Sequence, residues 1–221
     1  MGVLDLPRLI VLYGPDGVGK STQIDILADH LSSKGCAVRK VWLRGPHTLA
    51  FLLSKLLVGM GRTRRISNSF GRVKTLPRIG SNPIVMQLWA LTEFVSVLPL
   101  IFFKVLLPIE LGYLILADRY VLDVVVSTAF YIDDPEFVRS RIARVLVKLI
   151  PGGSVLIHLD ADYDTLVARR GVLVEPRVFI DFQKEGYAWL SGAVPTHYID
   201  TSKLTVDETS EAILGILGSR R

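Results

Sequence analysis

The sequence predicts an α/β fold, in which helices flank a doubly wound parallel sheet of about five strands. Short apolar runs of strand length alternate along the chain with longer segments of helical periodicity. A glycine-rich turn joins the first apolar run to the first helix. The length of 221 residues suits a single domain, residues 1–221, and no linker or internal repeat interrupts it.

Each strand is expected where an apolar run ends in a turn, and each helix where apolar residues recur on one face. The predicted strands lie at residues 8–13, 37–43, 111–117, 155–159 and 196–199. The predicted helices lie at residues 20–33, 49–60, 121–131, 135–150, 163–170, 178–191 and 205–217, of which the last opens with a capping box.

Two segments are less regular than the rest. Residues 84–107 are helical in composition, although Pro99 is expected to break the helix. Their apolar part is shorter than the roughly 20 residues of a membrane span, which favours a core helix or a dimer interface. Residues 61–82 mix Arg, Ser, Gly and Pro without periodicity, which indicates a basic loop or flap.

The composition narrows the class of protein. Half of the residues are apolar and the mean hydropathy is +0.41, which indicates wide buried sheets, an oligomer interface or a membrane-facing surface. Cys36 is the single cysteine, so a disulfide framework is excluded, and the four histidines lack the spacing of metal ligands. The first residues have neither a signal-peptide nor a myristoylation pattern, so a cytoplasmic protein is expected.

Positive charge is concentrated in one stretch of the chain. No acidic residue lies between Asp29 and Glu93. The eleven basic residues there are Lys34, Arg39, Lys40, Arg44, Lys55, Arg62, Arg64, Arg65, Arg72, Lys74 and Arg78. Such a local excess attracts phosphates, nucleic acid or anionic lipid, and a solvated face is an equal alternative.

Residues 14–21, GPDGVGKS, fit the phosphate-binding pattern G-x-x-x-x-G-K-[ST]. Glycines let successive N–H groups turn toward phosphates, and the start of the next helix adds partial positive charge. Lys20 is expected to reach the β- and γ-phosphates of ATP, and Ser21 to ligate Mg²⁺. The residues predicted to bind ATP here are Gly14, Gly17, Val18, Gly19, Lys20, Ser21 and Thr22.

Two further segments carry charge suited to phosphoryl transfer. Asp118 follows a predicted strand, where it would face the loop and hold Mg²⁺ or its water, and Arg119 could neutralise phosphate charge. Arginines on both sides of Gly171 suggest a lid at about residues 168–178 that closes over the phosphates. The predicted catalytic residues are Lys20, Asp118, Arg119, Arg169, Arg170 and Arg177.

With these landmarks in order, the chain resembles the thymidylate kinase family of nucleoside monophosphate kinases, which have the P-loop NTPase fold. The similarity covers residues 8–44, 111–131 and 155–203. It implies that Asp16 contacts the sugar hydroxyl of the acceptor and that Arg44, in the turn Arg-Gly-Pro, holds the acceptor phosphate. It also implies that Arg119 and Tyr120 of the Asp-Arg-Tyr motif line the acceptor site. Residues 200–203 look like the loop that packs against adenine, which adds Thr201, Ser202 and Lys203 to the residues expected to bind ATP.

The chain departs from the family pattern around the acceptor base. There the family has an arginine that reads the base and an aromatic residue that stacks on it. This sequence offers Trp89, Glu93 and Phe94 as contacts and no arginine. Gly45 replaces an acidic residue, and Asp123 stands where a small hydroxyl residue is usual.

The leading hypothesis is transfer of a phosphoryl group from ATP, with Mg²⁺, to a nucleoside monophosphate, for which dTMP is the first acceptor to test. The enzyme is expected to be a homodimer paired through its apolar helices. A kinase for another phosphorylated acceptor or a nucleic-acid end is an alternative. A nucleotide-switched binding module that docks a protein or a membrane surface through residues 84–107 is another, and neither nucleic acid nor membrane is the favoured partner.

Overall fold

A computed structural model describes residues 7–80 and 82–219. Its centre is a five-stranded sheet in the order β2-β5-β1-β6-β7, and all neighbouring strands are parallel. The strands are β1 (Leu9–Tyr13), β2 (Val38–Trp42), β5 (Leu114–Asp118), β6 (Val155–Asp160) and β7 (His197–Asp200). The predicted fold class and number of strands are therefore confirmed.

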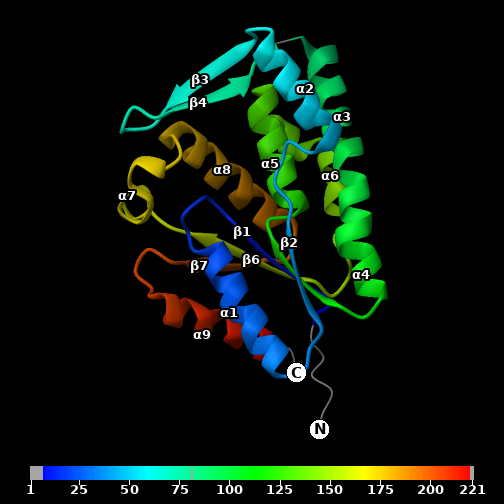
Figure 1. The fold of residues 1–221 in the computed structure, drawn as a ribbon, viewed down its shortest axis with the longest axis vertical. Helices are drawn as coiled ribbons and strands as arrows, with labels where there is room; N and C mark the ends of the chain where they lie inside the picture. Colours follow the sequence, from blue (N-terminus) through cyan, green and yellow to red (C-terminus); the bar gives the residue numbers. More distant parts are fainter. Residues whose placement is uncertain (1–6, 81, 220–221) are drawn as a thin grey trace.

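Helices cover both faces of the sheet (Figure 1) because its central strand is apolar on both sides. Leu9, Val11 and Tyr13 of β1 point into one core, which is covered by α3 (Pro83–Ile101), α5 (Val121–Ile132), α6 (Arg141–Val147) and α8 (Arg177–Ala193). Ile10 and Leu12 point into the other core, under α1 (Lys20–Ser33) and α9 (Val206–Gly218). The alternation of β1 therefore builds the two layers of helices.

The segment predicted as a loop or flap at residues 61–82 is instead an antiparallel hairpin, apart from residue 81, which lies outside the described residues. It consists of β3 (Thr63–Ser67) and β4 (Val73–Pro77). The hairpin has a core contact that the local sequence does not reveal, since Leu76 is buried with Phe130 and Phe179. It projects beside α2 (Thr48–Gly59), away from the main sheet (Figure 1).

The prediction that Pro99 breaks the helix at residues 84–107 is wrong. The chain stays helical through α3, a π-helical turn η1 (Phe102–Leu106) and α4 (Leu107–Glu110). Proline removes one hydrogen bond of the α-helical ladder, and a π turn close by is a common way to absorb such a defect. Val97, Ile101, Val105 and Ile109 keep one side of this long helix in the core, which outweighs the defect.

The helix expected at residues 135–150 is also interrupted. The 3₁₀ turn η2 (Pro135–Arg139) comes first, and α6 begins after Ser140. The Ser140 side chain accepts a hydrogen bond from the Ala143 backbone N–H and so starts a new helix. The short helix α7 (Tyr163–Arg170) lies where it was predicted, and the 3₁₀ turn η3 (Gly171–Leu173) follows it.

Candidate active site

The loop between β1 and α1 depends on glycine at places where a side chain would collide. Gly14 has a φ of 139°, and a Cβ atom there would lie 1.9 Å from the backbone oxygen of Leu159. Gly19 has a φ of 98° and caps the start of α1. These positive φ values curl the backbone so that its N–H groups and the helix N-terminus can face an anion. The side chain of Val18 is buried in the core, so its share in such a site is its backbone N–H.

Parallel pairing of β1 with β5 brings the end of β5 to this loop. Leu12 pairs with Asp118 in the sheet, and the Ser21 hydroxyl donates a hydrogen bond of 2.5 Å to Asp118 Oδ2. Asp118 Oδ1 is buried and has no hydrogen-bond partner among the described residues. A carboxylate and a hydroxyl side by side are hard oxygen ligands of the kind that Mg²⁺ takes.

Residues 7–80 and 82–219 contain no group of three or more His, Cys, Asp or Glu side chains that could hold a metal by themselves. Mg²⁺ usually keeps several waters and takes one or two carboxylates together with substrate phosphates. Ser21 and Asp118 therefore fit an ion that arrives with a nucleotide.

Lys20 is buried at the floor of the loop, where its ammonium donates a hydrogen bond of 2.7 Å to the Pro15 backbone oxygen. Burial and, after it, the charge of Arg119 lower the pKa of Lys20 to about 7. Acidic neighbours oppose this shift without cancelling it. An anion that enters the loop would therefore stabilise the charged form of Lys20.

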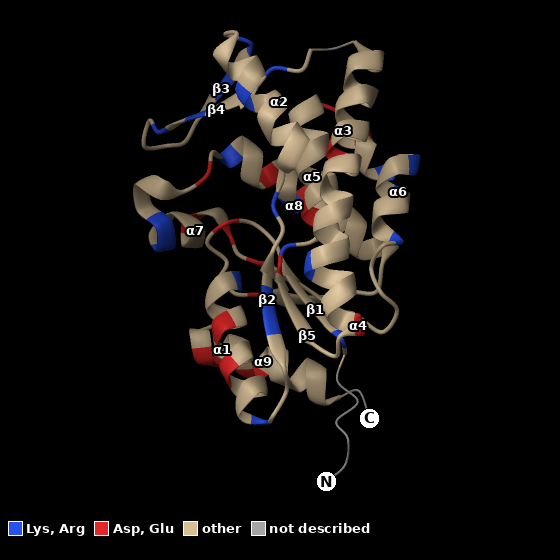
Figure 2. Cartoon of the chain, turned by 45° about the vertical axis from the view of Figure 1, so that its right-hand side comes forward, with Lys and Arg blue, Asp and Glu red and all other residues tan. Residues whose placement is uncertain are grey.

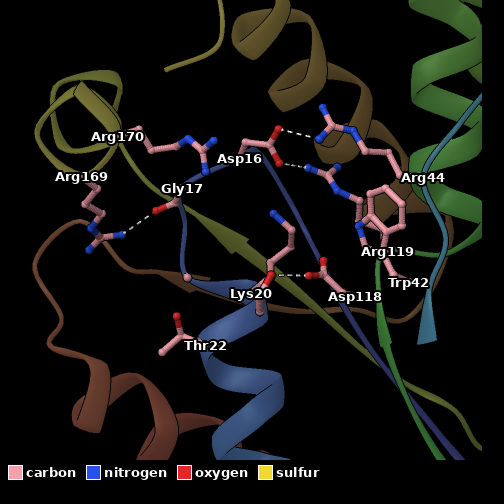
Figure 3. A pocket seen from close by; sticks show the side chains of 12 residues that line it. Asp16, Gly17, Lys20, Thr22, Trp42, Arg44, Asp118, Arg119, Arg169 and Arg170 are labelled. Carbon is pink, nitrogen blue, oxygen red and sulfur yellow. Dashed lines mark hydrogen bonds and ion pairs between the residues drawn. The ribbon is translucent and has the colours of Figure 1, made fainter. Parts of the chain in front are cut away.

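Asp16 connects the loop to two arginines. Its carboxylate lies 2.9 Å from the nearest guanidinium nitrogen of Arg44 and 2.5 Å from that of Arg119 (Figure 3). Burial by itself would raise the pKa of Asp16, but the positive charges of Arg119, Lys20 and Arg44 outweigh it and hold the pKa well below its usual value. Asp16 is therefore a fixed negative charge between the two arginines.

The two arginines have different surroundings. The side chain of Arg44 is 26% exposed and lines the pocket, whereas that of Arg119 is 1% exposed. Arg119 also contacts the carboxylate of Asp123, and it donates a hydrogen bond of 3.2 Å to the Tyr187 hydroxyl. Tyr187 in turn donates to Asp123, and burial raises its pKa well above the usual value, so its proton stays in place. Asp123 thus neutralises Arg119 from behind.

Arg169 and Arg170, two arginines of the predicted lid, reach the loop from the end of α7. The stem of Arg170 passes over Gly17 so closely that a Cβ atom at Gly17 would lie 2.8 Å from its Cδ. Arg169 donates hydrogen bonds to the Thr201 hydroxyl at 2.9 Å and to the Thr201 backbone oxygen at 2.6 Å. Thr201 donates to the backbone oxygen of Val18 at 3.3 Å, so the predicted adenine loop, the lid and the phosphate loop meet here.

The basic hairpin holds the lid segment. Asn68 is buried and its amide donates to the backbone oxygens of Val172 and Val174, at 3.0 and 2.8 Å. The ammonium of Lys74 lies 2.9 Å from Glu175, whose other oxygen lies 3.4 Å from Arg44. The hairpin, residues 172–175 and Arg44 therefore form one chain of contacts.

These groups surround a pocket of about 430 Å³ (Figure 3). Its lining residues are Asp16, Gly17, Gly19, Lys20, Ser21, Thr22, Trp42, Arg44, Asp118, Arg119, Arg169 and Arg170. Most predicted catalytic and phosphate-binding residues thus come together.

Several other predicted site residues lie elsewhere. Arg177 is paired with Asp181 at 3.5 Å on the outside of α8, and Lys203 is exposed. Ser202 bonds to the Asp200 side chain. Tyr120 is buried and donates to the Leu149 backbone oxygen. Trp89 and Glu93 are buried, and Phe94 packs against the core, outside the lining of this pocket.

Sequence reasoning missed residues whose signals are weak in a single chain. Trp42 lines the pocket, and Asn68 and Lys74 hold the lid from a hairpin that was not foreseen. Asp123 is an unusual acid at its place in the sequence, but its contact with Arg119 depends on the fold. Its spacing of four residues from Arg119 on a helix start was the available signal.

Comparison with known proteins gives a match at the level of the fold. No protein-family model matches the chain, and no curated protein sequence does. A solved thymidylate kinase from Candida albicans is 18% identical, with a TM-score of 0.59 over 97% of this chain and 92% of that chain. A thymidylate kinase from Ehrlichia chaffeensis is 16% identical, with a TM-score of 0.59 over 95% of this chain and 97% of that chain. The chain therefore has the P-loop NTPase fold of these kinases along nearly its whole length.

Proposed function

We propose that this protein is an ATP-dependent nucleoside monophosphate kinase, and that dTMP is the first acceptor to test. The observation that carries the proposal is the single pocket of about 430 Å³ that joins two differently built ends. One end has Lys20, Ser21 and Asp118, which suit a triphosphate with Mg²⁺. The other end has Asp16 and Arg44, which suit the sugar and phosphate of an acceptor.

At the donor end, backbone N–H groups of residues 17–22 and the start of α1 bind the β- and γ-phosphates. Lys20 exchanges its bond to Pro15 for phosphate oxygens, which is favourable because its ammonium is poorly solvated where it lies. Ser21 and Asp118 would hold Mg²⁺ that arrives with ATP, and the ion would supply positive charge to the phosphates.

At the acceptor end, Arg44 turns from Asp16 to the phosphate of the nucleoside monophosphate. The release of Asp16 lets its carboxylate accept a hydrogen bond from the sugar 3′-hydroxyl. Arg119 stays behind Asp16 and fixes its position, since Asp123 and Tyr187 occupy the rest of its guanidinium. An acceptor phosphate oxygen is already a nucleophile, so positioning supplies most of the catalysis.

The lid arginines complete the site. Arg169 and Arg170 add positive charge where negative charge moves from donor to acceptor, and the closed segment excludes water that would otherwise hydrolyse ATP. Arg177 would join them only after leaving Asp181, which is a contact on the exposed side of α8.

The acceptor base is assigned to the region of Trp89, Glu93 and Phe94. Trp89 Nε1 and Glu93 Oε1 are buried without a hydrogen-bond partner among the described residues, which supports a role in reading polar atoms of a base. A carboxylate here favours a base that donates an N–H, as the N3 position of thymine does.

The test is coupled ADP release with ATP·Mg²⁺ across a panel of deoxy- and ribonucleoside monophosphates. Turnover with one or a few members, dTMP first, is the expected result. An inert panel with ATP still bound would contradict the proposal and favour a nucleotide-switched binding module. Transfer to a 5′ nucleic-acid end with a steep salt dependence would instead favour the polynucleotide alternative.

A further inference from the structure

Arg44, the arginine assigned to the acceptor phosphate, contacts two carboxylates of the protein itself. One terminal nitrogen of its guanidinium lies 2.9 Å from Asp16, and the other lies 3.4 Å from Glu175. Both carboxylates compete with a phosphate for these nitrogens, because each offers the same charge-assisted hydrogen bonds. The groups that hold the two carboxylates therefore influence how readily Arg44 binds an acceptor.

Each of these carboxylates has a second cationic partner, which lies closer to it than Arg44 does. Asp16 lies 2.5 Å from the buried Arg119 (Figure 3), and Glu175 lies 2.9 Å from Lys74 on β4. The nearer cation repels Arg44 and so offsets part of the attraction of the carboxylate. Lys74 thus stands to Glu175 as Arg119 stands to Asp16.

Lys74 is placed to act on Glu175 and not on a bound substrate. Its ammonium lies 3.9 Å from the centre of the Phe179 ring on α8, and its side chain is 24% exposed. Lys74 and Glu175 line a separate pocket of about 120 Å³, whereas Lys74 is outside the lining of the pocket of about 430 Å³. Any effect of Lys74 on an acceptor therefore passes through Glu175.

The hairpin β3–β4 also fixes the position of Glu175. Asn68 and Arg72 donate hydrogen bonds to backbone oxygens of residues 172–174, directly before this glutamate. Figure 2 shows the basic hairpin above the segment between α7 and α8, which carries an acidic position. Because other contacts hold both Lys74 and the segment that carries Glu175, the pair can keep its geometry when Arg44 turns to a substrate.

We propose that Lys74 is a positioning residue for the acceptor, because it neutralises Glu175 and so keeps Arg44 available for the acceptor phosphate. This inference rests on the proposed function, in which Arg44 holds that phosphate. The hairpin lies outside the residues over which the sequence resembles thymidylate kinases, so the resemblance does not assign this role.

The alternative is that the Lys74–Glu175 pair only ties the hairpin to residues 172–175. A tie would be loosened by the loss of either charge, so both losses would affect acceptor binding in the same direction. Neutralisation of Glu175 predicts opposite results. Loss of the Lys74 charge leaves Glu175 to hold Arg44 more tightly, whereas loss of the Glu175 charge removes a competitor of the phosphate.

The test uses the nucleoside monophosphate that the turnover panel identifies, dTMP first. Calorimetry without ATP measures its Kd, and steady-state kinetics measure KM and kcat. Lys74→Met removes the charge and keeps an unbranched apolar stem against Phe179. We expect this variant to raise Kd and KM for the acceptor about fivefold or more, with a smaller change in kcat and in ATP affinity.

A second substitution decides between the two roles. Glu175→Gln keeps the shape of the side chain and should bind the acceptor at least as tightly as the wild type. The double variant Lys74→Met, Glu175→Gln should return Kd to within about twofold of the wild-type value, because the uncompensated charge is gone.

Arg72→Ala is the matched control. It removes another cation of the hairpin and a hydrogen bond of 3.2 Å to the Leu173 backbone oxygen. Acceptor Kd should stay within about twofold of the wild-type value, since Arg72 holds the segment through its backbone only. Thermal melting of every variant checks that it is folded.

The inference is overturned if Lys74→Met binds the acceptor as well as the wild type does, or if Glu175→Gln or Arg72→Ala weakens binding as much as Lys74→Met. A double variant that binds as weakly as Lys74→Met would also overturn it. The proposed function fails in a different way, when the wild type turns over no member of the panel.

Discussion

Arg44 and Arg119 both contact Asp16, but their exposure gives them different tasks. Both arginines line the pocket, but the Arg44 side chain is 26% exposed, whereas that of Arg119 is 1% exposed and is enclosed by Asp16, Asp123 and Tyr187. Removing one partner of a buried ion pair leaves an uncompensated charge, so Arg119 is better suited to hold Asp16 than to move. We therefore assign acceptor affinity to Arg44.

The variant Arg44→Ala tests this assignment. Loss of a charge-assisted hydrogen bond to phosphate should raise the KM for the acceptor roughly tenfold to a hundredfold, with ATP affinity nearly unchanged. Steady-state kinetics and equilibrium ATP binding measure the two quantities, and Arg39→Ala on the exposed side of β2 is the control. A comparable loss of ATP affinity would mean that Arg44 belongs to the donor end.

Lys20 predicts a pH dependence of ATP binding. With a pKa of about 7, this lysine is mostly neutral at pH 8 before ATP binds. Phosphate charge stabilises the ammonium and raises its pKa, so ATP binding at pH 8 should take up a proton, and ATP affinity should fall as the pH rises above 7.

Calorimetry at pH 8 in two buffers of different ionisation enthalpy measures the uptake. The variant Lys20→Arg keeps the charge and does not titrate, so its uptake should vanish. Equal values for the wild type and Lys20→Arg would show that another group takes the proton.

Gly14 gives a prediction about the loop itself. The variant Gly14→Ala puts a methyl group against the Leu159 backbone oxygen and forces alanine to a φ of 139°. The φ strain costs about 1–3 kcal/mol, and the collision adds to it. Denaturant unfolding should show this loss of stability. Gly35→Ala is the control, since it shares a positive φ of 85° but a Cβ atom there meets open space. Equal losses would mean that the close approach to Leu159 contributes nothing.

Some residues of the site belong to motifs that can be recognised in a short stretch of sequence, and others have roles that depend on contacts with distant parts of the chain. Lys20, Ser21 and the glycines form a contiguous motif, and Asp118 follows a strand whose place beside β1 is implied by the fold class, so sequence reasoning predicted them. The roles of Asp123, Tyr187 and Asn68 depend on contacts between segments far apart in the chain. The spacing of residues in a single sequence does not indicate such contacts.

Among the elements, the hairpin β3–β4 holds the proposed lid segment through hydrogen bonds from Asn68. Asn68→Ala removes two hydrogen bonds to the lid segment, each of about 1 kcal/mol, so residues 171–176 should open more often. We expect amide exchange in this segment to accelerate roughly tenfold or more, and turnover to fall while ATP affinity changes little.

Hydrogen exchange read by mass spectrometry, combined with steady-state kinetics, makes this measurement. Ser69→Ala alters the exposed neighbouring position and should leave both readouts at wild-type values. Equal exchange in the two variants would contradict the proposal that Asn68 of the hairpin holds the lid segment closed.

The hairpin also shows why elements differ in predictability. Strands β1, β5 and β6 are short continuous apolar runs, and their length and composition were enough to predict them. The strands of the hairpin are short and basic, and their stability comes from Leu76 packing against Phe130 and Phe179 in helices that follow later in the chain. In the same way, the helix continues past Pro99 because one side of it is buried in the core.

At the scale of the whole molecule, the two cores on either side of β1 determine the architecture. The fold is shared with thymidylate kinases at 16–18% identity over nearly the full length. Such agreement is possible because the fold needs buried strands, helices and one glycine loop in order, and it tolerates many apolar sequences in those positions. It leaves the acceptor open, since function resides in the site and not in the fold.

The proposed activity is transfer of a phosphoryl group between two nucleotides within one pocket. The most direct measurement follows ATP·Mg²⁺ and dTMP by ³¹P nuclear magnetic resonance after addition of the protein. We expect the diphosphate signals of ADP and dTDP to grow at equal rates as those of ATP and dTMP decline. Growth of inorganic phosphate with dTMP unchanged, or an unchanged spectrum with saturating ATP bound, would contradict dTMP as the acceptor, and the same result with every nucleoside monophosphate of the panel would contradict the transfer itself.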